Sequence, residues 1–164
     1  MKKVFLLIIL AIIVCMSSLA QTCMKPIRSS VNMYEFYCDG LSLSPDGYVW
    51  SGTIVKETNL PIGPLKNIPF AANSFVEFYE SGYVGRGKIA HDIYVSPYCS
   101  NSGFVKLKGG YSYCFANTKE GGCGVVYGTV GESCIINGVR YNAGDGLSLN
   151  NCKGGMVITP CDVQ

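Results

Sequence analysis

The residues best placed to carry chemistry are the cysteines. The chain has nine. Cys15 lies inside an apolar leader, and eight cysteines follow it. An even set of cysteines in a short exported chain is typical of disulfide bonds, and the absence of any Cys-x-x-Cys pair argues against a metal site. We therefore expect four disulfides, no metal centre and no cofactor, with the bonds formed by Cys23, Cys38, Cys99, Cys114, Cys123, Cys134, Cys152 and Cys161.

The spacing of these cysteines suggests one set of partners. Cys114 and Cys123 are separated by eight residues, as are Cys152 and Cys161, which suits a link across one hairpin. Cys99 and Cys134 lie 35 positions apart, at the same place in adjacent repeats, which leaves Cys23 with Cys38. Links between neighbouring hairpins remain an alternative, because sequence alone does not determine connectivity.

The single histidine, His91, is followed by Asp92. A His-Asp pair can activate a nucleophile, but a triad is recognised by its geometry. The corresponding residues one repeat earlier are Lys56 and Glu57, so we expect a solvated loop histidine.

Three acidic residues also occupy related positions in the repeat, at Asp39, Glu77 and Asp145. They leave a two-carboxylate hydrolase open as an alternative. No motif of a hydrolase, phosphate-binding loop or metalloprotease is present, so we predict that the protein is not an enzyme.

Aromatic residues give the best candidate for a binding surface. Tyr48 and Trp50 share strand parity, and Tyr83 is the counterpart of Tyr48 in the next repeat. Rings in such a row suit stacking on sugars or burial at a protein interface. The same rings could equally form the hydrophobic core, because aromatic side chains bury large areas.

The elements that must position these residues are repeated. The strand-like pentapeptides DGLSL, SFVEF, GGYSY and DGLSL start at residues 39, 74, 109 and 145, a spacing of 35, 35 and 36. A fixed period of this size indicates a repeat architecture. After two of them come turns and matching second strands, GYVWSGTIVKE from Gly47 and GYVGRGKIAHD from Gly82, and VVYGTV from Val125 matches VWSGTI from Val49.

The repeats are expected to consist of strands. Apolar residues alternate with polar ones in Val76-Glu77-Phe78 and Val105-Lys106-Leu107, a period of two. Pro45-Asp46-Gly47 and Glu80-Ser81-Gly82 are turn sequences. The sequence therefore predicts an all-β fold, an antiparallel meander of about four degenerate β-hairpin repeats of about 35 residues, stapled by disulfides.

The hairpin FYESGYVGRGKIA resembles MORN-type repeats and related hairpin repeats of bacterial exported proteins. The likeness extends from Leu41 to Val95 and is faint elsewhere. It implies an extended antiparallel meander and a scaffold or interaction role, and it identifies no ligand.

The chain begins with a secretory signal. Residues 1–20 combine Lys2 and Lys3, an apolar run from Val4 to Val14 and the cleavage site Ser18-Leu19-Ala20. We expect an N-terminal signal helix over residues 1–20, a single β-repeat domain over residues 21–164, and no membrane span after cleavage. The leader is too short for an uncleaved anchor, and lipidation of Cys23 would leave an odd number of cysteines.

Charge excludes one class of partner. The chain has 13 Lys and Arg against 11 Asp and Glu, and removal of Lys2 and Lys3 makes the mature chain neutral. A nucleic-acid binder needs a basic surface. The sequence predicts a secreted, non-enzymatic interaction module or envelope-associated structural module whose partner is another protein or a surface glycan, with a carbohydrate-binding module using Tyr48, Trp50 and Tyr83 as the alternative.

Overall fold

The protein is an all-β molecule in which every pair of strands is antiparallel. The computed structural model describes residues 20–64, 66–98, 103–117 and 123–149. The strands are β1 (Thr22–Pro26), β2 (Met33–Tyr37), β3 (Ser42–Leu43), β4 (Val49–Ile54), β5 (Thr58–Gly63), β6 (Lys66–Phe70), β7 (Ser74–Phe78), β8 (Val84–Lys88), β9 (Ile93–Val95), β10 (Val105–Leu107), β11 (Ser112–Asn117), β12 (Cys123–Thr129), β13 (Cys134–Ile136), β14 (Val139–Tyr141) and β15 (Gly146–Ser148).

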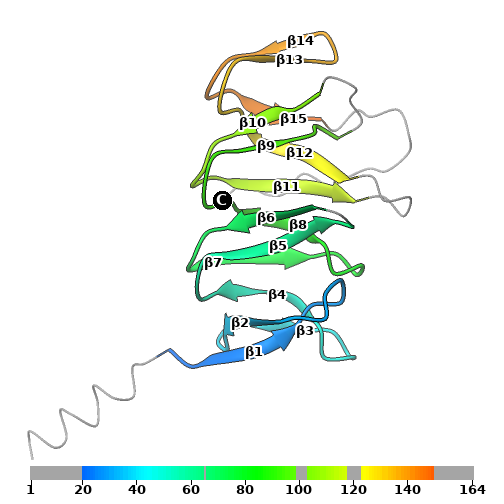
Figure 1. The fold of residues 1–164 in the computed structure, drawn as a ribbon. Coiled ribbons are helices and arrows are strands. Elements are labelled where there is room, and N and C mark those ends of the chain that lie inside the picture. Colours follow the sequence, from blue (N-terminus) through cyan, green and yellow to red (C-terminus); the bar gives the residue numbers. More distant parts are fainter. Residues whose placement is uncertain (1–19, 65, 99–102, 118–122, 150–164) are drawn as a thin grey trace, which may run out of the picture.

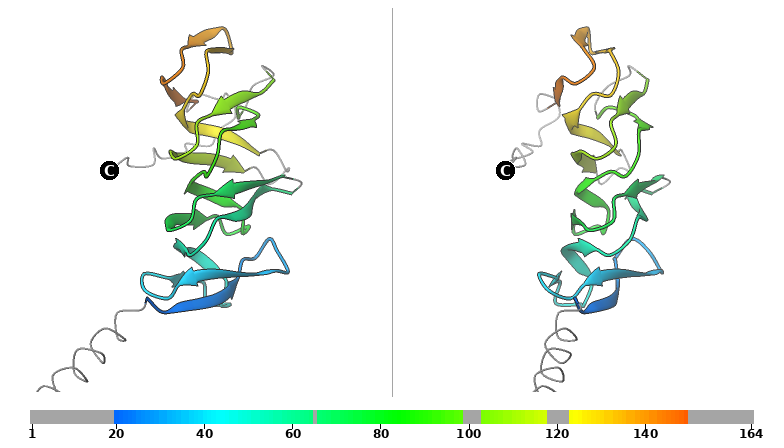
Figure 2. Two further views of the ribbon diagram at one scale, coloured as in Figure 1. Left: turned by 60° about the vertical axis from the view of Figure 1, so that its left-hand side comes forward. Right: turned by 90° about the vertical axis from the view of Figure 1, so that its left-hand side faces the viewer.

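Nine of these strands form one long sheet. Its order is β1-β2-β4-β7-β8-β11-β12-β15, with β3 paired to β4. The remaining strands form three separate two-stranded hairpins, β5–β6, β9–β10 and β13–β14. The strands stack side by side, so the molecule is elongated across the strand direction (Figures 1 and 2).

The hairpins form a second layer, which the sequence analysis did not anticipate. The chain leaves the long sheet after β4, β8 and β12, makes one hairpin, and then returns to the sheet at β7, β11 and β15. Apolar side chains of both layers meet in one core. The long sheet contributes residues such as Phe36, Ile54, Val76, Val84 and Phe115, and the hairpins contribute Leu60, Ile62, Ile68, Val95, Leu107 and Ile136.

Two turns of the sheet have the same geometry. Gly47 and Gly82 have φ values of 83° and 84°, a left-handed conformation that glycine adopts without the steric cost of a Cβ. Each donates its N–H to the carbonyl three residues earlier, at 2.9 Å to Ser44 and 2.8 Å to Tyr79. The two sequence-matched glycines therefore occupy equivalent corners of the backbone.

A second set of matched glycines lies beneath core side chains. A Cβ on Gly87 would lie 2.6 Å from the Phe70 ring, and one on Gly128 would lie 1.9 Å from the Tyr113 ring. The equivalent Gly52 faces Leu41 at 2.7 Å and Phe36 at 3.3 Å. The glycine recurs in β4, β8 and β12 because each strand must leave room there for a large apolar side chain.

Tyr113 anchors the core with its hydroxyl as well as its ring. The side chain is fully buried. Its oxygen accepts the Lys108 N–H at 2.8 Å and lies 2.9 Å from the Lys108 carbonyl and 2.8 Å from the Thr129 carbonyl, to which it can donate. Burial raises the pKa of Tyr113 to about 12.

The loop between β1 and β2 docks on the two glycine turns. Arg28 pairs with Asp46 at 2.7 Å, and its guanidinium lies 5.4 Å from the centre of the Tyr48 ring. Ser29 Oγ donates to the Gly82 carbonyl at 2.6 Å. One loop therefore ties the first strands to turns 44–48 and 79–83.

Candidate functional site

The long sheet carries three β-bulges, at equivalent positions of β4, β8 and β12. Leu43 pairs with Val49 and Ser42 with Ser51, which leaves Trp50 as the extra residue in β4. The extra residue is Gly85 in β8 and Val126 in β12. A bulge places an additional residue opposite a single partner and increases the local twist.

The three extra residues differ in what covers them. The Tyr79 ring lies over Gly85, where a Cβ would meet it at 3.1 Å, and the Tyr79 hydroxyl donates to the Phe115 carbonyl at 2.7 Å. Val126 is buried with Cys114 and Ala116 in a small outer cluster. Trp50 is 46% exposed. It is therefore the one bulge residue of the three that keeps a large apolar side chain open to solvent.

Two more exposed aromatic side chains share the outer face of the sheet with Trp50. Thr53 pairs with Phe75, so Phe75 faces outward from the neighbouring strand β7, and it is 47% exposed. Tyr79, at the end of the same strand, is 38% exposed. We call Trp50, Phe75 and Tyr79 the Trp50 surface.

The other two members of the sequence-predicted row are less open. Tyr48 and Tyr83 each follow a turn glycine and are half-buried. Arg28 covers the Tyr48 ring. Tyr48 and Trp50 flank the buried Val49. Of the three predicted aromatic residues, Tyr48 and Tyr83 therefore pack at the turns and Trp50 lies on the open face of the sheet. Phe75 and Tyr79 were missed by the sequence analysis, although Phe75 alternates with the core residues Ser74 and Val76 and could have been found by its parity.

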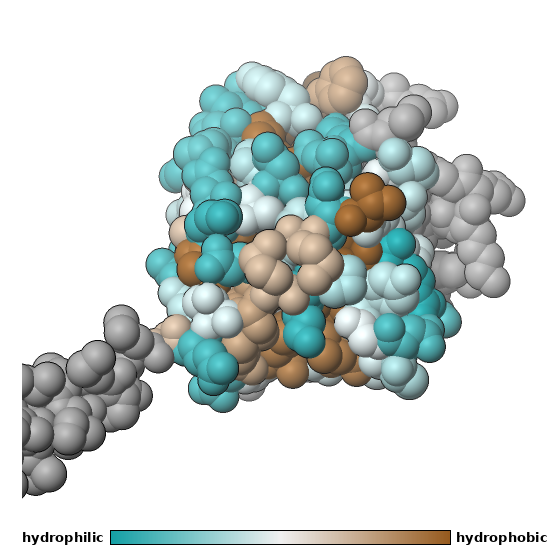
Figure 3. All heavy atoms as spheres, turned by 60° about the horizontal axis from the view of Figure 1, so that its bottom comes forward, coloured by the Kyte–Doolittle hydropathy of each residue, from teal (hydrophilic) through white to brown (hydrophobic). Residues whose placement is uncertain are grey.

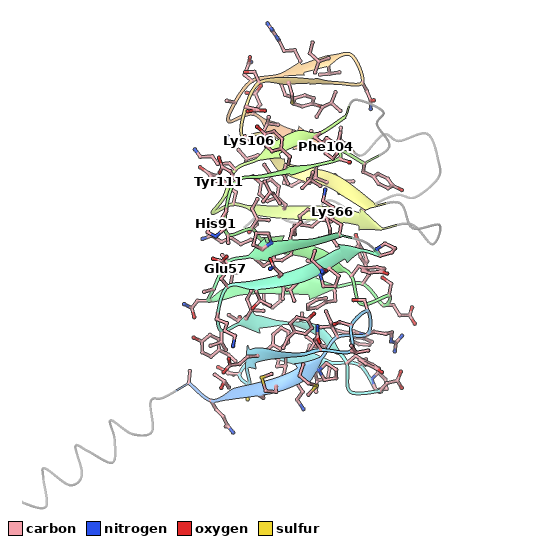
Figure 4. All side chains as sticks on the ribbon, viewed as in Figure 1. Glu57, Lys66, His91, Phe104, Lys106 and Tyr111 are labelled. Atoms are coloured by element: carbon pink, nitrogen blue, oxygen red, sulfur yellow. The ribbon has the colours of Figure 1, made fainter. Side chains whose placement is uncertain are left out.

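His91 and Asp92 contact different partners. His91 Nε2 lies 2.9 Å from Glu57 Oε1, and both side chains are exposed (Figure 4). Asp92 accepts the Gly109 N–H at 2.8 Å and pairs with Lys106 at 3.3 Å. The Gly109 N–H and then Lys106 hold the pKa of Asp92 below its ordinary value. This arrangement links neighbouring segments and aligns no nucleophile with the imidazole.

The three related carboxylates do not come together. Asp39 precedes β3 and Asp145 precedes β15, and in the sheet β4, β7, β8, β11 and β12 separate these two strands. Glu77 lies between them on β7, opposite Ser51 and Arg86. Two-carboxylate catalysis needs side chains less than about 10 Å apart, so this set does not supply it.

Cationic side chains lie beside aromatic rings on the hairpin side of the molecule. Lys66 Nζ is 5.7 Å from the centre of the Phe104 ring, and Lys108 Nζ is 5.6 Å from that of Tyr111 (Figure 4). Lys106 is paired with Asp92. These contacts are spread over several elements and do not form one continuous basic stripe among the described residues.

Three of the four cysteine pairs that the spacing predicted are not bonded in this structure, and the fourth, Cys152–Cys161, lies outside the described residues. Cys23, Cys38 and Cys134 are free, so neither the Cys23–Cys38 nor the Cys99–Cys134 bond is formed. Cys114 is disulfide-bonded, and its partner lies outside the described residues. Cys99, Cys152 and Cys161 also lie outside them, as does the expected signal helix.

A Cys114–Cys123 bond is wrong for a geometric reason. Cys114 pairs with Tyr127, whereas Cys123 pairs with Asn117, three positions along the same strand. Three residues span roughly 10 Å of strand. Disulfide partners have Cα atoms less than about 7 Å apart, so the register of this hairpin rules the bond out.

Comparison with known proteins identifies no relative of this chain. Neither a protein family nor a curated protein nor a solved structure matches the chain. Within the described ranges, no helix is long and apolar enough to cross a membrane. The same residues contain no group of three or more His, Cys, Asp or Glu side chains that could hold a metal ion.

Proposed function

We propose that this protein is a secreted, non-enzymatic interaction module or envelope-associated structural module that contacts another protein through the Trp50 surface. The observation that carries the proposal is the exposure of Trp50 at a position whose two equivalents are covered. Gly85 lies under Tyr79, and Val126 is buried. A large aromatic side chain left open at such a position is typical of a binding hot spot.

The proposed module consists of four degenerate units. The first three are β3–β6, β7–β10 and β11–β14, and β15 begins the fourth. The equivalent turn glycines, the three bulges and the recurrent glycine beneath a core side chain support this division. Stacked units of this kind give an extended surface suited to recognition.

Secretion and disulfide stapling remain part of the proposal. The basic and apolar leader over residues 1–20 supports export. Eight cysteines then follow in a chain that would reach an oxidising compartment. The bonded state of Cys114 is consistent with at least one such link.

Partner capture with a matched pair of variants tests the protein-binding proposal. The tagged mature chain, Trp50→Ala and Tyr94→Ala would each be mixed with surface and secreted proteins of the source cells. Tyr94 is also an exposed aromatic residue, but it lies on the hairpin layer. We expect a partner that is retained by wild type and Tyr94→Ala and lost with Trp50→Ala. Equal capture by all three chains would contradict the proposal.

A surface glycan is the alternative partner, and the chemistry of Trp50 favours it as the second candidate. Aromatic faces stack on the apolar faces of sugar rings, and tryptophan offers the largest such face. Trp50 is the only tryptophan, so its fluorescence reports directly on this site. A glycan array followed by fluorescence titration should show binding that Trp50→Ala abolishes. Sugar binding that is unchanged in Trp50→Ala would exclude this surface as the platform.

A further inference from the structure

The strongest unassigned feature is a pair of cysteines at the edge of the long sheet. Cys23 lies in β1, opposite Phe36, and Cys38 directly follows β2. The Cys38 N–H donates to the Gln21 carbonyl at 2.8 Å, which continues the ladder past the end of β2. Cys23 and Cys38 are therefore diagonal neighbours on the same face of one antiparallel pair.

The two thiols are in direct contact and accessible. Their side chains share a hydrogen bond, and both are half-buried, so a small reagent can reach them. Figure 3 shows apolar side chains at the surface of this end of the molecule. Met24 of β1 and Met33 of β2 are both about half exposed. Among the described residues no third His, Cys, Asp or Glu side chain joins the two thiols.

We propose that Cys23 and Cys38 form a disulfide that crosslinks the edge strand β1 to β2. The register and the thiol contact bring these residues together independently of the spacing argument. The inference does not rest on the Trp50 surface, and either proposal can fail without the other.

The bond forms by thiol–disulfide exchange with a small-molecule disulfide such as oxidised glutathione. One cysteine loses its proton, and its thiolate attacks a sulfur of the oxidant, which gives a mixed disulfide and releases one glutathione thiolate. The second cysteine, also deprotonated, attacks the protein sulfur of that bond and releases the second glutathione thiolate. Two electrons pass to the oxidant, and the two glutathione thiolates take up the two protons.

The Cys23–Cys38 disulfide would hold strand β1, which has few other contacts with the sheet. β1 is paired on one side only, to β2. The crosslink encloses the loop whose residues Arg28 and Ser29 hold the two glycine turns. Closing a loop of this length favours the attached state by roughly a hundredfold, so we expect hydrogen exchange of the β1 amides to slow by a similar factor on oxidation.

Peptide mapping without reductant tests the bond directly. The mature chain would be equilibrated with oxidised glutathione, its free thiols blocked with N-ethylmaleimide, and the protein digested with trypsin. Cleavage after Arg28 separates Cys23 from Cys38, because Lys25 is followed by Pro26 and resists trypsin. We expect the peptide ending at Arg28 to remain joined to the peptide 29–56, with a mass lower by two hydrogen atoms than the sum of the two thiol peptides.

Two controls separate this bond from other outcomes. Cys38→Ser should abolish the joined peptide and leave Cys23 either blocked by N-ethylmaleimide or as its mixed disulfide with glutathione. The oxidation-dependent slowing of β1 exchange should be absent in the Cys23→Ser/Cys38→Ser double variant. If that variant fails to fold, reduced and oxidised wild type supply the exchange comparison. Recovery of both cysteines as blocked thiols, or of either joined to a different cysteine, would overturn the proposal.

Discussion

At the scale of single residues, the fold depends on small side chains placed beneath large ones. Gly87 lies under Phe70, and Gly128 lies under Tyr113. Gly128 also has a φ of 153°. Close-packed interiors respond to the volume of a single methyl group, so these positions tolerate no larger residue.

Alanine at these glycines should lower the free energy of unfolding. Gly87→Ala forces a methyl group against the Phe70 ring and should cost about 1–3 kcal/mol through overpacking. Gly128→Ala should cost more, because its Cβ would overlap the Tyr113 ring. Urea unfolding measures both, with Gly146→Ala in the open strand β15 as the control. Equal midpoints for the three variants would show that the rings move aside freely.

The Tyr113 hydroxyl makes a second residue-scale prediction. Tyr113→Phe leaves the part-buried N–H of Lys108 and the carbonyls of Lys108 and Thr129 without this partner. An unsatisfied buried polar group costs about 1–3 kcal/mol. Denaturant unfolding should show a loss in this range. Tyr141→Phe, at a half-buried tyrosine on β14, should cost less.

Tyr113 also predicts a dependence of stability on alkaline pH. Its pKa is raised from 10.0 to about 12, mainly by burial. The folded state therefore favours the neutral phenol, and this contribution is fully present below pH 10. It is lost as the pH rises from about 10 to about 12, because tyrosine in the unfolded chain ionises near pH 10 while the folded state keeps Tyr113 neutral until about 12. The alkaline decline in unfolding free energy should be shallower in Tyr113→Phe than in wild type, and parallel curves would contradict the assignment.

At the scale of elements, β3–β6 and β7–β10 each run as a strand, a glycine turn and a bulged strand followed by a hairpin. The β1–β2 loop contacts both turns, but its backbone packs directly against Gly82, whereas only the Arg28 side chain reaches the turn at Gly47. A Cβ on Gly82 would lie 2.3 Å from the Ser29 nitrogen, whereas a Cβ on Gly47 would meet nothing within 4 Å. The same backbone corner is therefore open at the glycine in the first turn and covered by loop backbone in the second.

Matched alanine variants separate these two roles. Gly47→Ala should cost about 1–2 kcal/mol, the cost of a left-handed residue with a Cβ. Gly82→Ala should cost this amount and also displace the loop at Arg28 and Ser29. Urea unfolding gives the free energies, and hydrogen exchange of residues 27–32 reports the displacement. The idea is wrong if both variants lose the same stability and leave exchange in that loop unchanged.

At the scale of the whole molecule, the long sheet gives each strand a different degree of support. β4, β7, β8 and β11 are paired on both sides, and β1 is paired on one. The hairpin layer covers the inner face, and one core unites the two layers. Local opening is easiest where buried contacts and ladder partners are fewest.

Hydrogen exchange should therefore follow position in the sheet. Amides of β4, β7 and β8 should be protected to nearly the full free energy of unfolding, and those of β1 should exchange much faster. Native-state hydrogen exchange by NMR measures this gradient under reducing conditions, where the Cys23–Cys38 disulfide is reduced. Uniform protection across the sheet would indicate a single cooperative unit with no weaker edge.

The sequence by itself determined the class of fold and much of its periodicity. Alternating apolar residues in Val76-Glu77-Phe78 predicted strands, and the matched Gly47 and Gly82 predicted equivalent turns, because only local geometry was involved. The recurrence of Gly52, Gly87 and Gly128 was visible as a pattern, although its cause was not. Local spacing carries this information since strand period and turn conformation depend on near neighbours.

Only the tertiary structure decided what the repeats pack against. Pro61, Ile62 and Gly63 end strand β5 in a second layer, which the sequence analysis did not predict. Trp50 and Val126 are the extra residues of equivalent bulges, but Val126 packs with Cys114 and Ala116 whereas Trp50 is left open. The predicted Cys99–Cys134 and Cys114–Cys123 disulfides failed because spacing along the chain does not state which residues lie opposite each other. Register and layer packing depend on contacts between distant segments, and these contacts separate a buried ring from an exposed one.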